Sequence, residues 1–413
     1  MDSTELEKRS RRWLVTSDPA SLWPGVEVGA LRRAAVEIEE CTRGILDGRT
    51  ASLGRADGSD ARVIGIAALV TGMGPLLGYW LEHGQLDVAE PLGRVLRRHL
   101  AHGRARIARI RREVTPVLEA LVAAGTEPGI LKGYYTTHVY FPEPGLRPLA
   151  DVDVYVEAAH AERAARTLGE AGFTPAHSAA LFKEDWYPPG GPGRIRSFEM
   201  WDARSPWKLE LHAALDFGPV IRHGVHLDVV DPVPEPWDAL GVPLRVARQP
   251  MLFVTAAVHM SSELANARLL RLVELVLMTR RDVPSGALDW SAVEEILERT
   301  GATRFTHPAL ALVDQLAPGT VPSRLRERAR QRSSRIARGV VRTMTPATPI
   351  IADHVSFAER VMWEPGMLGV IRRVFEMFLP PPRVPVRELP RIYAGRVWRI
   401  CVGRIGWGVT SRA

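Results

Sequence analysis

The chain has 413 residues, of which 46% are hydrophobic and 24% are charged, a composition typical of globular proteins, and its length suggests two or three compact units. Its two cysteines, Cys41 and Cys401, lie near opposite ends without the spacing of metal ligands, which excludes a disulfide framework and a zinc site and favours a reducing, cytoplasmic compartment. The formal charge of +7 is uneven, because residues 322–413 contain 18 Arg but only six Asp or Glu, and we interpret that basic region first as a solvated helical surface.

Residues 1–112 are predicted to form an N-terminal helical region, since apolar residues recur three and four positions apart in segments such as LRRAAVEIEECTRGIL. The chain begins without the apolar core and cleavage site of a signal peptide. Residues 63–81 carry no charge and are long enough to cross roughly 30 Å of hydrocarbon, but Gly72, Gly74 and Pro75 interrupt them. We therefore predict two buried helices that meet at Gly74 and Pro75, and no membrane span.

Strand patterns begin beyond this region, and residues 113–217 are predicted to form a core around a small mixed β-sheet. EPGILKG is a short apolar run closed by glycine, and LADVDVYVE alternates with period two. A helix follows in AHAERAARTLGEAGF, with Gly172 as its stop, and PWKLELHAALDF alternates again. Before this last strand, WYPPGGPGR is expected to be a loop or hairpin tip that could cover a site.

Helical patterns return at Gln249, and residues 218–345 are predicted to form a helical domain in which Asp289 starts the helix of DWSAVEEILERTG. PPPRVP interrupts the stretch that follows, and residues 346–413 are predicted to form a basic C-terminal helical tail. The expected fold class is therefore α+β, with α and β elements mixed in a small sheet core that N-terminal and C-terminal helical regions flank.

Asp151 and Asp153 are the first candidates for chemistry. Alternate side chains of a strand lie on one face, so these two carboxylates project together at a spacing of roughly 6.5 to 7 Å. Two carboxylates so placed can bind Mg²⁺ ions roughly 3.5 to 4 Å apart, which activate an attacking oxygen and stabilise a leaving pyrophosphate. Glu210, which two leucines flank, is the expected third carboxylate if its strand lies beside the first. A bare Asp-x-Asp pair more often marks only an exposed strand face.

Lys132 and Gly133 are candidates for binding phosphate, because they end the first predicted strand. A glycine there lets the backbone approach a triphosphate, and the N–H groups of a following helix would face the anion. Lys132 is one of four lysines in a chain that otherwise uses arginine, and lysine is a compact point charge for phosphate. The alternative is a lysine that extends from a strand end into solvent.

Three of these segments, ILKG, LRPLADVDVYV and LELHAAL, resemble the signature of the uncharacterised nucleotidyltransferase family, a branch of the DNA-polymerase-β-like superfamily with the minimal nucleotidyltransferase fold. Less specific similarity extends over most of the chain from about residue 60. The resemblance implies Mg²⁺ as the cofactor, with Mn²⁺ as an alternative, and an NTP such as ATP as substrate. The site residues that it implies are Asp151, Asp153 and Glu210 for catalysis and metal binding, Lys132, Gly133 and Arg147 for nucleotide binding, and His212 near the metal or on the acceptor side.

The implied activity is transfer of a nucleoside monophosphate from an NTP to a hydroxyl or phosphate of an unidentified small-molecule, peptide or protein acceptor. Some positions depart from the pattern: Lys-Gly stands where the wider superfamily has Gly-Ser or Gly-Gly, Ala213 where an aromatic residue is usual, and Glu274 where Asp is common. The alternative is a non-catalytic nucleotide-binding or regulatory module of the same fold. No nucleic-acid partner is expected, because the Arg-rich C-terminal region has no interleaved aromatic platform and no recognised binding motif.

Overall fold

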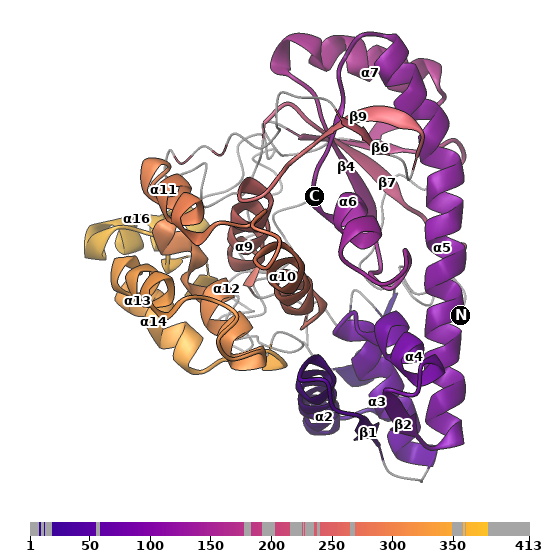
Figure 1. Ribbon diagram of the computed structural model, residues 1–413, viewed down its shortest axis with the longest axis vertical. Helices are drawn as coiled ribbons and strands as arrows, with labels where there is room; N and C mark the ends of the chain where they lie inside the picture. The colour runs from indigo at the N-terminus through magenta and orange to yellow at the C-terminus, as the bar shows by residue number, and fades with distance from the viewer. Residues whose placement is uncertain are drawn as a thin grey trace.

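The computed structural model has an α+β fold, as the sequence predicts, in which helices from both ends of the chain flank one mixed sheet (Figure 1). The residues that the structure describes are 8, 9, 12, 19–54, 58–176, 183–191, 203–214, 225, 227, 235–237, 240–264, 269–348, 358–359 and 361–378. In Figure 1 the sheet lies beside the upper part of the long helix α5 (Glu90–Ala123), the N-terminal helices lie beside its lower part, and the C-terminal helices form a third group across from α5.

The N-terminal part is helical with one small exception. Its helices are α2 (Val28–Leu46), α3 (Gly58–Val70) and α4 (Gly74–Glu82), preceded by a 3₁₀ turn at Pro19–Ser21, and a parallel pair of three-residue strands, β1 (Ala51–Leu53) and β2 (Leu86–Val88), lies among them. The predicted break is present, because α4 begins at Gly74 with Pro75 in its first turn. Among the described residues no single helix is long and apolar enough to cross a membrane; only α3 and α4 together reach that length, and they are bent by 118°.

Helix α5 joins two hydrophobic cores. Its 34 residues extend over about 51 Å at 1.5 Å per residue. Leu92, Leu96 and Leu100 in its first half pack with the N-terminal helices, whereas Val114 and Leu118 in its second half pack against the sheet. The predicted boundary between residues 112 and 113 thus lies within this helix. The division of the chain into four regions stays a prediction.

The sheet has seven strands in the order β5-β6-β7-β4-β3-β9-β8. Its strands are β3 (Gly129–Ile130), β4 (Asp151–Tyr155), β5 (Thr174–Ala176), β6 (Lys183–Tyr187), β7 (Lys208–His212), β8 (Glu235–Trp237) and β9 (Val242–Val246). The pairs β4–β7 and β3–β9 are parallel, and the other neighbours are antiparallel. Helix α6 (Lys132–Val139) follows β3, and a 3₁₀ turn (Ala158–His160) and helix α7 (Ala161–Glu170) follow β4. The loop that begins in WYPPGGPGR continues outside the described residues.

The two faces of the central strands differ in chemistry. Val152, Val154, Leu209 and Leu211 point to one face, where they are buried in the core that α5 and α7 cover. Their neighbours in sequence point to the other face, and these are mostly charged. The period-two alternation therefore separates a packing face from a polar face, and the candidate site lies on the polar face.

The C-terminal helices form a bundle that shares one hydrophobic core with the N-terminal helices. They are α9 (Met251–Ser262), α10 (Leu269–Asp282), α11 (Trp290–Arg299), α12 (Thr303–Leu316), α13 (Ser323–Arg332), α14 (Arg335–Arg342) and α16 (Gly366–Phe378). Asp289 caps α11 as predicted, because its carboxylate accepts hydrogen bonds from the backbone N–H groups of Ser291 and Ala292 at 3.1 and 3.2 Å. PPPRVP and the basic segment after it lie outside the described residues.

Candidate functional site

Strand register brings the acidic residues of β4 and β7 together. The two strands are parallel, with Asp151 opposite Lys208, Asp153 opposite Glu210, and Tyr155 opposite His212. Partners in register lie on the same face of a sheet, so all six side chains belong to the polar face. Strand β6 extends this face, because its antiparallel pairing with β7 sets Asp185 opposite Glu210 and Lys183 opposite His212.

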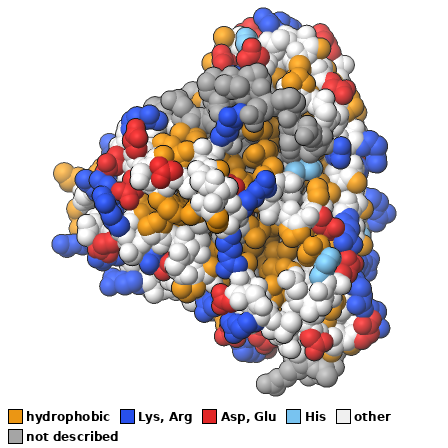
Figure 2. All heavy atoms as spheres, in the orientation of Figure 1, with side chains coloured by type: hydrophobic (Ala, Val, Ile, Leu, Met, Phe, Trp, Pro, Cys, Tyr) orange, Lys and Arg blue, Asp and Glu red, His pale blue; other side chains and the backbone are white. Residues whose placement is uncertain are grey.

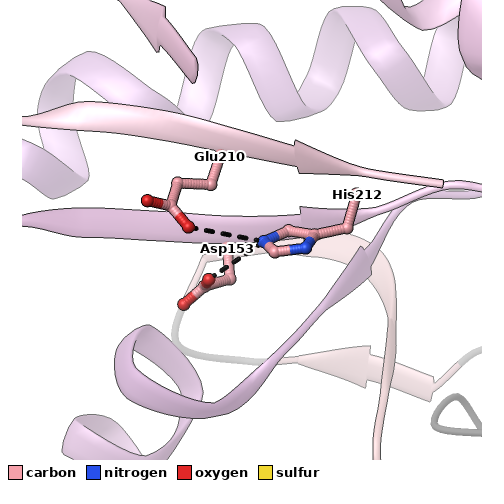
Figure 3. Close-up of side chains that lie close together, drawn as sticks. All are labelled: Asp153, Glu210 and His212. Atoms are coloured by element: carbon pink, nitrogen blue, oxygen red, sulfur yellow. Dashed lines mark hydrogen bonds and ion pairs between the residues drawn. The ribbon is translucent and has the colours of Figure 1, made fainter. Parts of the chain in front are cut away.

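Asp153, Glu210 and His212 form the centre of the site (Figure 3). The His212 Nε2 atom lies 3.1 Å from Asp153 Oδ1 and 3.6 Å from Glu210 Oε2, and all three side chains are buried. One ligand atom from each residue lies within 4.8 Å of the others, a spacing that suits a shared metal ion. Two carboxylate oxygens fit Mg²⁺ or Mn²⁺, and the imidazole nitrogen is a donor that Mn²⁺ accepts more readily than Mg²⁺. This donor set therefore fits a divalent cation.

Asp151 lies on the same face but outside that group of three. Burial, reinforced by the negative charges of Asp153 and Glu210, raises the pKa of Asp151 to about 6. Asp153 behaves differently: burial opposes ionisation, but the Lys132 ammonium and the hydrogen bond with His212 hold the pKa of Asp153 below its ordinary value. A bound cation would stabilise the ionised form of Asp151 against both burial and the repulsion from its neighbours, so the site favours cation binding.

Three of the four lysines of the chain lie at this site. The Lys132 Nζ atom lies 3.2 Å from Asp153 Oδ1, the Lys183 Nζ atom 2.5 Å from Glu210 Oε2, and the Lys208 Nζ atom 2.5 Å from Glu210 Oε1. Lys208 also donates to Asp185 Oδ2 at 2.7 Å. Although burial opposes ionisation, His212, Lys183 and Lys208 together hold the pKa of Glu210 well below its ordinary value. The carboxylates of Asp151, Asp153, Asp185 and Glu210 thus lie beside three ammonium groups and the imidazole of His212.

Lys183, Lys208 and Asp185 are site residues that the sequence analysis missed. The scarcity of lysine was the available signal, since only four of the 54 Lys and Arg residues are lysines. An ammonium group on a flexible stem can leave a carboxylate when another cation arrives, whereas a guanidinium group binds a carboxylate through two fixed hydrogen bonds. Lysine at these positions therefore suits carboxylates that exchange partners.

Gly133 and Arg147 lie together, but Arg147 pairs away from the acidic residues. A Cβ atom on Gly133 would lie 3.0 Å from the Arg147 Nη1 atom, so the glycine leaves room for the guanidinium group. The Arg147 Nε atom donates to both carboxylate oxygens of Glu274 on α10 at 3.0 Å, and the Thr136 hydroxyl donates to the same carboxylate. Arg147 thus connects the sheet region to the C-terminal helices, and its predicted contact with nucleotide stays a prediction.

One protein family matches the part of the chain that contains this site. The model of a family described as an uncharacterised nucleotidyltransferase matches residues 61–318, which is more than half of the chain. Neither a curated protein nor a solved structure matches the chain. The chain belongs to this uncharacterised nucleotidyltransferase family.

Proposed function

From this family membership, we propose that the protein is an Mg²⁺-dependent nucleotidyltransferase, with Mn²⁺ as an alternative ion, that transfers a nucleoside monophosphate from an NTP such as ATP to a hydroxyl or phosphate of an acceptor. The observation that carries the proposal is the meeting of Asp153, Glu210 and His212 on adjacent parallel strands, next to Lys132 at the start of a helix. The acceptor is a small molecule, a peptide or a protein. We place the reaction in the cytoplasm, where the buried free thiol of Cys41 would stay reduced.

Each residue has a defined task in this proposal. Asp153, Glu210 and Asp151 would hold the divalent ions, with His212 as an added ligand, and the ions would supply charge neutralisation and orientation of the phosphates. Lys132 and the backbone N–H groups of the first turn of α6, beginning at Gly133, would bind the anionic phosphates. An acceptor oxygen would then bond to the α-phosphorus of the NTP, while the bond between this phosphorus and the oxygen that bridges to the β-phosphorus breaks. Pyrophosphate would leave, and a carboxylate would take the proton of the acceptor.

A nucleic-acid acceptor is not part of the proposal. Lys and Arg side chains on the face shown in Figure 2 are scattered and interspersed with Asp and Glu, and they do not form one basic patch. Nucleic-acid binding depends on clustered basic groups that contact the phosphate backbone. Binding of a small acceptor or a peptide does not require such a cluster of basic groups.

The test is divalent-dependent NTP binding and pyrophosphate release by the full chain, with each of the four NTPs in turn. A variant with Asp151→Asn and Asp153→Asn should lose divalent-dependent binding, whereas Asp314→Asn, which removes a carboxylate paired with Arg326 on the C-terminal helices, should bind as the wild type does. Binding without pyrophosphate release, when candidate acceptors are supplied, would support the non-catalytic nucleotide-binding module. Absence of NTP binding with Mg²⁺ and with Mn²⁺, or equal binding by the double variant, would refute the proposal.

A further inference from the structure

Lys132 also contacts a second charged cluster, which belongs to the C-terminal helices. Its Nζ atom lies 3.5 Å from the Nε2 atom of His259 on α9, and that nitrogen lies 3.6 Å from Glu263 Oε2. Arg271 on α10 donates to the same Glu263 oxygen at 3.0 Å. These contacts form a continuous path from Asp153 on β4, through Lys132 at the start of α6, to the helices of the C-terminal region.

Lys132 therefore lies among the carboxylates of the sheet and that of Glu263. Asp153 holds it directly, and the negative charges of Glu210, Asp151 and Glu263 also act on it. Its side chain is 16% exposed and that of His259 is also 16% exposed, so solvent screens these charges only in part. The ammonium group can turn on its four-carbon stem without moving the backbone. If the ammonium group moves toward Glu263, it stays near a negatively charged carboxylate.

A divalent ion at Asp153 would disfavour the present position of the Lys132 ammonium group. In the structure the ammonium group lies 3.2 Å from the carboxylate oxygen that is also nearest to His212. A divalent cation bound to that oxygen would repel the ammonium group at close range. The affinity for the ion would then depend on where the ammonium group moves, and Glu263 is the carboxylate that His259 Nε2 connects to Lys132.

We propose that Glu263 provides a second position for Lys132, so that the ammonium group leaves Asp153 for the Glu263 side when the divalent ion binds. The inference rests on the proposed function, because it assumes that Asp153 binds the ion. Arg271 already pairs with the Glu263 carboxylate, so it determines how strongly Glu263 attracts the incoming ammonium group. Glu263 and Arg271 are thus positioning residues that act through Lys132, and the C-terminal helices are part of the nucleotide site.

This arrangement predicts opposite effects for two variants of one ion pair. Glu263→Gln removes the second position, so Lys132 stays at Asp153 and divalent-ion affinity falls roughly 10-fold, the lower end of what outer partners of metal ligands contribute. Arg271→Met removes the guanidinium partner of Glu263, so this carboxylate attracts Lys132 more strongly and divalent-ion affinity rises several-fold. A merely structural ion pair would give losses of the same sign from both substitutions.

The experiment measures Mn²⁺ binding to the full chain without nucleotide, by electron paramagnetic resonance or calorimetry. Both substitutions are made in the wild type and in a Lys132→Met background, where neither should change Mn²⁺ affinity because the residue through which they act is gone. Glu294→Gln on α11, which removes a carboxylate paired with Arg328, is the matched control and should have no effect. If Glu263→Gln unfolds the chain, Arg271→Met alone still tests the sign.

The outcomes separate the two proposals. No Mn²⁺ binding by the wild type, or equal binding by Asp153→Asn, would refute the proposed function itself. Three other results would overturn the Lys132 movement and leave the proposed function intact, provided that Mn²⁺ binding depends on Asp153. They are Mn²⁺ affinity unchanged by Glu263→Gln, Mn²⁺ affinity lowered by Arg271→Met, and effects of the two substitutions that are equally large in the Lys132→Met background.

Discussion

Arg106 holds the beginnings of the two strands that carry the acidic residues. This buried side chain on α5 donates hydrogen bonds to the backbone carbonyl groups of Leu149 and Pro206, both at 2.8 Å, and of Ser205. These carbonyl groups lie two residues or so before β4 and β7 begin. Because methionine is about as long as the aliphatic stem of arginine, Arg106→Met removes all three hydrogen bonds while it keeps the packing of the stem.

The expected loss of stability follows from those three hydrogen bonds. At about 1 kcal/mol of net stabilisation for each, Arg106→Met should lower the free energy of unfolding by about 3 kcal/mol. Urea denaturation measures this loss as a lower midpoint with an unchanged slope. Arg109→Met one turn along is the control, because that side chain is 25% exposed and donates to one backbone carbonyl group, that of Ala203 at 3.0 Å. A loss no larger than that of Arg109→Met would refute the assignment of Arg106 as the group that holds the strand ends.

Further predictions concern the polar face itself. Burial raises the pKa of Asp151 to about 6, so the folded protein binds a proton at this residue more tightly than the unfolded chain does. The stability that this proton contributes is present below the ordinary pKa near 3.8 and is lost as pH rises to about 6. Asp151→Asn should therefore be more stable than the wild type by about 1–2 kcal/mol at pH 7, with no gain at pH 4, in urea titrations of chelator-treated protein. An Asp151→Asn variant of unchanged stability at pH 7 would contradict this. His212→Asn should lower Mn²⁺ affinity more than Mg²⁺ affinity, measured by calorimetry, because imidazole is the donor that Mg²⁺ uses least; equal losses would argue against ligation by His212. Lys208→Arg should weaken Mn²⁺ binding several-fold without lowering the melting temperature, because a guanidinium group binds Glu210 through two hydrogen bonds and yields less readily; unchanged binding would show that lysine is not required there.

The sequence was sufficient to predict the strands that carry the chemistry. DVDVYV and LELHA alternate strictly, and burial of one face fixes the direction in which every other side chain points. The sequence left the pairing of the two strands as a condition for Glu210 to join the acidic pair, and the structure has Asp153 opposite Glu210. The capping aspartate Asp289 was also predictable, because its signal is local.

Contacts between distant segments were the part that the sequence could not supply. Strand β3 has only two residues, and its parallel partner β9 lies more than 100 residues later, so neither length nor a turn motif indicates the pair. Arg147 is 127 residues from its partner Glu274, and its position just before the acidic pair suggested phosphate binding. Asp185 and Lys183 reach Glu210 only because β6 pairs antiparallel with β7 in one particular register.

The choice between lysine and arginine connects these observations to function. Arg106 and Arg147 each make several fixed hydrogen bonds to carbonyl or carboxylate groups that hold strands and helices in place. Lys132, Lys183 and Lys208 contact the carboxylates that would bind divalent ions. Under the proposed function, a chain that uses arginine almost everywhere would thus have lysine where a cation must be able to leave. The three lysines offset carboxylate charge, which limits the repulsion among buried acids. If divalent ions and nucleotide phosphates bind as proposed, the flexible stems would let the ammonium groups withdraw as those charges arrive.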